Sequence, residues 1–189
     1  MDLKLSITLN MPLYVQGKNL RKVLPASLWD KIRYEIYRRN NNECMVCGYK
    51  EKLQAHEEWK INKESRVLIL KNIKCLCYNC HSIKHFNHSA LRSNSEERIK
   101  ELISHFMKVN ECTKEDYRAH VKELNEKNPR NPLYYKGRNP LEMIEKVKHL
   151  DAEESALKKE HWTFQLYPDL PYYEDICQFL KKKNLLAIN

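Results

Sequence analysis

Two short stretches decide the fold of this chain: CMVC at Cys44–Cys47 and CYNC at Cys77–Cys80. Each stretch brings two thiolates to one ion across a tight turn, and four soft ligands complete a tetrahedral zinc site. Gly48, directly after the first pair, permits the close turn that such a knuckle needs. The gap between the pairs is longer than in a plain zinc ribbon, which indicates an inserted hairpin. The spacing therefore predicts a structural Zn²⁺ held by Cys44, Cys47, Cys77 and Cys80.

The rest of the sequence indicates a protein of a reducing compartment without a membrane-spanning segment. The chain of 189 residues has no apolar run near the roughly 20 residues that a membrane span needs. No secretory leader is indicated at Met1–Asn10. We therefore expect an intracellular protein, cytoplasmic or nucleoid-associated, whose thiols stay reduced. The three cysteines outside the pairs, Cys75, Cys112 and Cys177, are interpreted as buried or incidental thiols.

The net charge of +9 lies almost entirely in the half that holds the cysteine pairs. Residues 1–90 carry 16 Lys and Arg against 8 Asp and Glu, whereas residues 91–189 carry 18 against 17. Nucleic acid is the natural partner of the first half, because Lys and Arg neutralise phosphates and release counterions. A solvated basic surface is the alternative. The candidates for phosphate contacts, each of which could equally be a solvated charge, are Arg38, Arg39, Lys74 and Lys84.

Hydrophobic patterning and capping residues predict an α+β chain. We expect a strand at Lys4–Val15, a helix at Ala26–Asn40, and a hairpin of two strands at Leu53–Lys60 and Arg66–Leu70. A helix should follow at Asn79–His88. Further helices are expected after Ser93, after Thr113, at Leu141–Leu150 and at Tyr172–Lys183.

The histidines form a second pattern. His81, His85 and His88 fall at i, i+4 and i+7 and share one face of the helix expected there. His56 lies on the first strand of the expected hairpin. Such imidazoles suit a second metal ion, although periodicity alone fits exposed or phosphate-contacting histidines equally well.

These segments together resemble the HNH endonucleases, the zinc-stapled branch of the ββα-metal nucleases. The matching stretches are CMVCG at Cys44–Gly48, LQAHE at Leu53–Glu57 and NIKCLCYNCH at Asn72–His81, followed by His85. The resemblance covers Trp29–His88, about a third of the chain. It implies that a hairpin and a helix hold one catalytic divalent ion, and that the product is a 5′-phosphate and a 3′-hydroxyl.

Carried over by position, the resemblance assigns roles to single residues. It implies that His56, His81 and His85 are metal ligands and that Asn72 is the central Asn that braces the catalytic loop. Three imidazoles suit Zn²⁺, Ni²⁺, Co²⁺ or Mn²⁺ better than Mg²⁺, which prefers oxygen.

Glu57 departs from the family pattern. At the two positions where this chain has His56 and Glu57, the family usually has Asp-His or His-His. By alignment Glu57 takes the position of the general base, for which its carboxyl pKa would have to rise. Alternatively, His56 is the base and Glu57 a ligand, which would favour Mg²⁺ or Mn²⁺. Glu57 and Glu58 also fit an exposed acidic pair without a role in catalysis. Because neighbours on a strand point to opposite faces, joint use of His56 and Glu57 requires a bulge or a strand end.

The sequence thus predicts an α+β protein with a small ββα-metal core, preceded by a strand and a helix and followed by a helical appendage. The expected domains are residues 1–92, with a core at about 29–88, and residues 93–189. The expected function is metal-dependent hydrolysis of DNA phosphodiester bonds, most naturally in double-stranded DNA. The alternatives are a non-catalytic zinc module that binds nucleic acid, and an interaction protein that works through its C-terminal helices. A homodimer through those helices is a further hypothesis.

Overall fold

The structure is a computed structural model that describes residues 3–8, 11–86, 95–128 and 140–187, with only the backbone for 140–144. The chain forms two compact units. One comprises Val15–Tyr78 with Lys159–Asn189, and the other comprises Met1–Tyr14 with Asn79–Lys158. The expected domain boundary between residues 92 and 93 lies outside the described residues.

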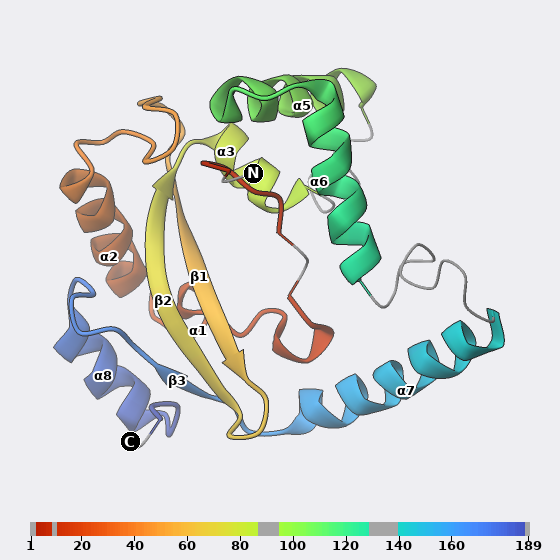
Figure 1. Cartoon of the computed structure of the whole chain (residues 1–189). Coiled ribbons are helices and arrows are strands. Elements are labelled where there is room, and N and C mark those ends of the chain that lie inside the picture. Colours follow the sequence, from red (N-terminus) through yellow and green to blue (C-terminus); the bar gives the residue numbers. More distant parts are fainter. Residues whose placement is uncertain (1–2, 9–10, 87–94, 129–139, 188–189) are drawn as a thin grey trace. The chain divides into compact units, whose positions relative to one another are not determined.

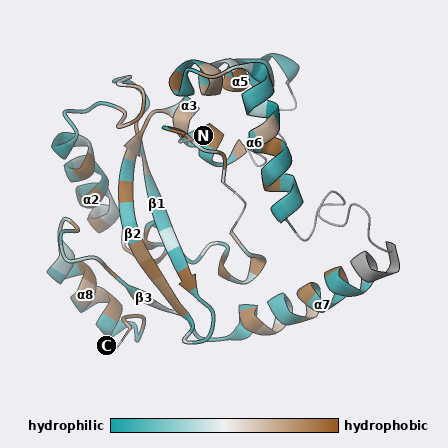
Figure 2. Ribbon diagram, viewed as in Figure 1, coloured by the Kyte–Doolittle hydropathy of each residue, from teal (hydrophilic) through white to brown (hydrophobic). Residues whose placement is uncertain are grey.

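A three-stranded sheet organises the first of these units (Figure 1). Its strands are β1 (Gln54–Asn62), β2 (Val67–Leu76) and β3 (Thr163–Gln165), in the order β1-β2-β3. β1 and β2 form the predicted antiparallel hairpin, and β3 pairs with β2 in parallel. Figure 2 shows why β2 takes the centre, since it carries long hydrophobic stretches while β1 is mainly hydrophilic. The core-facing residues of β2 are buried, among them Leu68, Leu70 and Ile73.

The sequence did not predict β3, which is three residues long. Its partners are distant in sequence: β2 pairs with it on one side, and at an isolated bridge Phe164 N donates to the carbonyl of Leu185 and Ala187 N donates to the carbonyl of Phe164. Such a short strand carries too little alternation to be recognised from sequence alone.

The helices of this unit are α1 (Leu20–Val23), α2 (Ala26–Arg39) and α8 (Tyr173–Lys182). The predicted helix at Ala26–Asn40 is confirmed as α2, which buries Trp29, Ile32 and Ile36 and contacts β1 and β2. This spacing of three and four residues is the stripe that a helix needs to cover a sheet. The predicted helix at Tyr172–Lys183 is confirmed as α8.

The helices of the other unit are α3 (Tyr78–Lys84, whose first residue belongs to the neighbouring unit), α5 (Glu96–Asn110), α6 (Lys114–Lys127) and α7 (Pro140–Lys159). α5 and α6 contact each other, with Phe106 of α5 lying 5.4 Å from the ring of Tyr117 of α6. The capping box at Thr113 and Asp116 is confirmed. α5, however, is capped by Ser95 and not by Ser93, which lies outside the described residues.

The predicted strand at Lys4–Val15 is wrong. The apolar alternation was a correct guide to burial, since Leu5 and Ile7 are both buried. Their backbone groups, however, bond to helix side chains. Leu5 N donates to Asn110 Oδ1 at 2.9 Å, and Ile7 N donates to His120 Nε2 at 3.2 Å. Residues 4–8 and 11–15 of this segment therefore form no strand, and Leu13–Val15 forms a 3-10 helix.

Other differences concern length. β2 continues to Leu76, six residues beyond the expected strand end at Leu70, and α7 continues to Lys159, nine residues beyond Leu150. Among the described residues, no helix is both long and apolar enough to span a membrane.

Candidate metal centres

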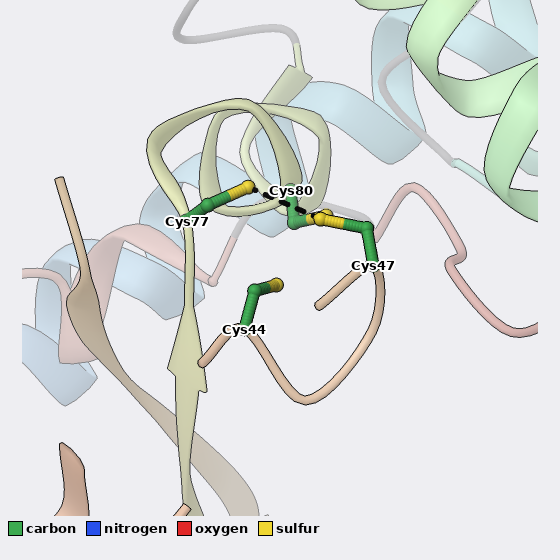
Figure 3. A group of neighbouring side chains, drawn as sticks. All are labelled: Cys44, Cys47, Cys77 and Cys80. Atoms are coloured by element: carbon green, nitrogen blue, oxygen red, sulfur yellow. Dashed lines mark hydrogen bonds between the residues drawn. The ribbon is translucent and has the colours of Figure 1, made fainter. Parts of the chain in front are cut away.

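The four paired cysteines meet where α3 follows directly on β2. Their sulfur atoms lie within 4.8 Å of one another. Figure 3 shows the four side chains turned toward a common centre, with Cys47 Sγ at 3.6 Å from Cys77 Sγ. Tetrahedral zinc with Zn–S bonds of about 2.3 Å places its sulfur atoms about 3.8 Å apart. The cluster therefore has the donor set and the spacing of a structural zinc site.

Backbone contacts hold the first knuckle in place. Gly48 has a φ of +75° and its N–H donates to the carbonyl of Cys44 at 2.9 Å, which closes the turn. Met45 N donates to the carbonyl of Cys75 on β2 at 2.9 Å, so the knuckle is tied to the strand that leads to Cys77. Cys75 itself is fully buried, as predicted, and burial raises the pKa of its thiol to about 11.

Three histidines form a second cluster. His56 on β1 and the pair His81 and His85 have ring nitrogens within 4.8 Å of one another. His56 is buried, whereas His81 and His85 are partly exposed. His85 N donates to the carbonyl of His81, which keeps the two rings on one helical face with centroids 4.9 Å apart. Among the described residues the group has three members, and three imidazoles alone would leave coordination positions open for water or substrate.

His88, the third histidine of the predicted helical face, lies outside the described residues. The structure describes the other two histidines of that face, His81 and His85. It brings them together with His56 on the hairpin.

Glu57 lies apart from the histidine cluster. The pairing of β1 with β2 is regular from Gln54 to Glu58, so His56 and Glu57 point to opposite faces. The register shift that the joint use of both side chains would need occurs later, between Glu58 and Trp59. Glu57 instead accepts hydrogen bonds from Arg21 N at 3.2 Å and from Trp59 Nε1 at 3.1 Å.

The environment of Glu57 changes its acidity. Burial raises the pKa of its carboxyl to about 7, against the opposing effect of the hydrogen bonds from Trp59 and from the backbone of Arg21 and Leu20. A carboxyl with that pKa exchanges protons readily at neutral pH. Its two oxygens, however, are engaged on the face away from the imidazoles.

Glu58, two residues after His56, lies on the same strand face as His56. It forms an ion pair with Lys74, with Oε1 and Nζ 2.9 Å apart. Lys74 is the cross-strand partner of His56, and Asn72 is that of Glu58, so these side chains line one face of the hairpin. Asn72 Oδ1 accepts a hydrogen bond from Ile73 N at 2.8 Å, so the predicted bracing Asn contacts its own backbone.

The predicted phosphate contacts occupy different environments. Arg38 donates two hydrogen bonds to Glu35, and Arg39 donates to Glu35 and to the carbonyl of Asp169. Both arginines keep exposed side chains. Lys84 is buried, and its ammonium donates to Ser6 Oγ at 3.2 Å. The phosphates of a nucleic acid would therefore be reached more easily by Arg38, Arg39 and Lys74 than by Lys84.

Sequence reasoning missed one residue at the metal centres. His105 on α5 lies with Nε2 at 3.2 Å from Cys80 Sγ. No spacing motif links positions 25 residues apart on different helices, so the sequence carries no signal for this contact. It depends on how α5 packs against α3.

Comparison of the chain with protein-family models, with curated proteins and with solved structures finds no significant match. What the structure contains is an α+β fold with consecutive β1, β2 and α3, together with a four-cysteine cluster at metal-binding distance. This arrangement is compatible with a zinc-stapled ββα-metal fold.

Proposed function

We propose that the chain is a metal-dependent endonuclease of the HNH type that hydrolyses phosphodiester bonds in double-stranded DNA. The observation that carries the proposal is the histidine cluster, in which one strand residue, His56, meets two residues of a helical face, His81 and His85. The four-cysteine cluster next to it supports the proposal, because a rigid scaffold is what a precise ligand set requires.

The three histidines would hold a divalent ion through neutral imidazole nitrogens. When bound, such an ion would neutralise charge on the phosphate and stabilise the leaving 3′ oxygen. The imidazole set favours Zn²⁺, Ni²⁺, Co²⁺ or Mn²⁺ over Mg²⁺. The basic excess of residues 1–90 would bring the DNA to this surface, with Lys74, the cross-strand partner of His56, contacting a phosphate.

The attacking water also needs a base, and two carboxylates compete for this role. Glu57 has the alignment position and a pKa of about 7 caused by burial, but its oxygens bond to Arg21 and Trp59. Glu58 lies on the face of His56, where Lys74 holds its carboxylate. Glu57 would have to leave its partners to act as a base, whereas Glu58 would act from its present face.

The test is nicking of supercoiled plasmid by the purified full chain, after chelation and with Mg²⁺, Mn²⁺, Ni²⁺, Co²⁺ or Zn²⁺ added back. We expect metal-dependent nicking that His56→Ala and His81→Ala abolish. His149→Ala is the matched control, because His149 is an exposed histidine on α7 outside both clusters. Equal nicking by all four proteins would overturn the assignment of the site.

A paired measurement separates the two carboxylates. Loss of a general base slows cleavage by roughly 100- to 10,000-fold. Glu57→Gln and Glu58→Gln are therefore compared in single-turnover cleavage with saturating metal. A loss of this size in one variant identifies the base, and two rates near that of the parent chain exclude both carboxylates.

The second candidate is a non-catalytic zinc module that binds nucleic acid. The observation that favours it is the engagement of Glu57 by Arg21 N and Trp59 Nε1, away from the imidazoles. This candidate predicts zinc-loaded protein that binds DNA but shows no cleavage with any of the five metals. That result would replace the nuclease proposal.

A further inference from the structure

The short helix α3 carries residues of both clusters, and contacts from other elements hold it in place. It contains seven residues, and an isolated helix of that length is not stable in water. Its position must therefore come from packing and from polar contacts. Within this unit, many of the described side-chain hydrogen bonds to α3 come from α5.

A polar clamp joins the two helices. Arg98 donates to Asn79 Oδ1 at 2.7 Å and to Glu101 Oε2 at 2.7 Å, and Asn79 Nδ2 donates to Glu101 Oε1 at 3.0 Å. A longer contact of 3.4 Å links Arg98 to Ser82 Oγ. Asn79 directly precedes Cys80, so the clamp fixes the backbone next to a predicted zinc ligand.

His105 extends this clamp to the sulfur atom itself, 3.2 Å from its Nε2. Cys80 is fully buried, so water does not compete for its sulfur. A thiolate bound to zinc has no proton to donate and accepts hydrogen bonds only. The ring must then be the donor, through the Nε2–H tautomer of His105.

We propose that His105 is a positioning residue of the zinc centre, which donates Nε2–H to the Cys80 thiolate. The inference rests on the zinc assignment of the four-cysteine cluster and is independent of nuclease activity. Four thiolates around Zn²⁺ leave two negative charges on the complex, and an N–H donor stabilises that charge where it lies. The hydrogen bond also fixes the direction of the sulfur lone pairs toward the ion.

His105 acts from outside the ligand set. The group of mutually close donor atoms consists of the four cysteines and does not include His105. Zinc with four thiolates is coordinatively closed, so a fifth ligand has no place in such a structural site. The role that remains for His105 is to hold one ligand and to lower its reactivity.

The consequence is chemical protection of one sulfur. Removing the donor makes the Cys80 thiolate more nucleophilic and more readily protonated, and a protonated or alkylated sulfur leaves the zinc ion. Loss of such an outer partner typically weakens metal binding by roughly 10- to 100-fold. The expected effect is a comparable acceleration of zinc loss and a faster alkylation of Cys80 in the zinc-loaded chain.

The experiment uses the full chain loaded with zinc, and separately with ¹¹³Cd²⁺ as a spectroscopic probe. His105→Leu removes the donor and keeps the bulk of the side chain, while His105→Gln retains an N–H at the place of Nε2. His149→Leu, at an exposed position on α7, is the control. The rate of zinc transfer to a chromogenic chelator and the alkylation of Cys80 by iodoacetamide are measured for each.

We expect zinc loss from His105→Leu to be at least about tenfold faster than from the parent chain and from His149→Leu, with His105→Gln in between. In the cadmium form of the parent chain, a scalar coupling should join ¹¹³Cd to the His105 ring N–H through the hydrogen bond. This coupling requires no variant, so it decides the question even if His105→Leu does not fold. Its absence, or unchanged zinc loss in a folded His105→Leu, would overturn the proposal.

Discussion

The cysteine and histidine clusters both include residues of α3 but differ in how they are built. The cysteine cluster has four ligands and a knuckle fixed by backbone hydrogen bonds at Gly48 and Met45. The histidine cluster, in the described part of the chain, brings three imidazoles together, and those of His81 and His85 are partly exposed. Closed thiolate sites stabilise a fold, whereas open imidazole sites leave room for chemistry. The difference teaches that one short segment, Cys77 to His85, can supply side chains both to a four-thiol cluster and to a group of imidazoles that is more open to solvent.

The largest effect should come from removing a ligand from the four-cysteine cluster. Cys44→Ser replaces a buried ligand, and structural zinc contributes about 10–16 kcal/mol of apparent binding energy in small zinc-dependent folds. We expect the variant to lose its tightly bound zinc and its cooperative unfolding transition, as measured by metal analysis and circular dichroism. Cys112→Ser, outside the cluster, is the control and should retain both. A Cys44→Ser protein with full zinc and an unchanged transition would show that the cluster is not a zinc site.

The second-largest effect should be confined to the histidine cluster. His85→Ala removes one of three imidazoles, and the loss of metal affinity should be at least about 100-fold, since changes to outer partners already cost 10- to 100-fold. Calorimetry with Ni²⁺ or Mn²⁺ should show this loss while the zinc bound by the cysteines remains stoichiometric. If His85→Ala also released that zinc, the two clusters would be one cooperative unit and the contrast between them would fail.

A smaller effect should separate DNA binding from metal binding. Lys74→Gln removes the cation opposite His56, and one lost phosphate contact should weaken DNA binding uniformly across sequences and reduce the salt slope by about 1. Fluorescence anisotropy at several salt concentrations measures both quantities. Lys60→Gln, an exposed lysine further along β1, is the comparison. An equal salt slope for Lys74→Gln and the parent chain would remove Lys74 from the proposed interface.

Local sequence rules were sufficient where the determinant is local. The spacing of CMVC and CYNC led to the cysteine cluster, and the i, i+4 relation of His81 and His85 led to the helical face. The capping box at Thr113 and the apolar stripe of α2 also follow from neighbours in sequence. In each case the pattern that gives the prediction spans only a few positions, even though the two cysteine pairs lie 30 residues apart.

Where the partner lies far along the chain, the same rules failed. The alternation of Leu5 and Ile7 indicated a strand, but Asn110 and His120 supply their hydrogen bonds. The contact of His105 with Cys80 is likewise set by tertiary packing. The position of the register shift is also set by the pairing of β1 with β2: it lies after Glu58, which leaves His56 and Glu57 on opposite faces.

The smallest expected effect concerns a histidine outside both clusters, and it provides a reference for their pH dependence. Burial lowers the pKa of His120, which stacks on Phe106 with ring centroids 5.6 Å apart and accepts a hydrogen bond from Ile7 N. Because the folded chain favours neutral His120, the unfolded chain binds more protons. Stability from this residue is therefore present above the unfolded pKa of about 6.5 and is lost as the pH falls through it toward the lower folded pKa.

One such group changes the free energy of unfolding by no more than about 1.4 kcal/mol per pH unit. His120→Phe keeps the stacking and removes the titration, so its urea unfolding should depend less on pH between about 7.5 and 5.5 than that of the parent chain. Both proteins carry the same metal clusters, so the difference isolates His120. Identical pH dependence in the two proteins would mean that His120 does not contribute to the acid sensitivity of the chain.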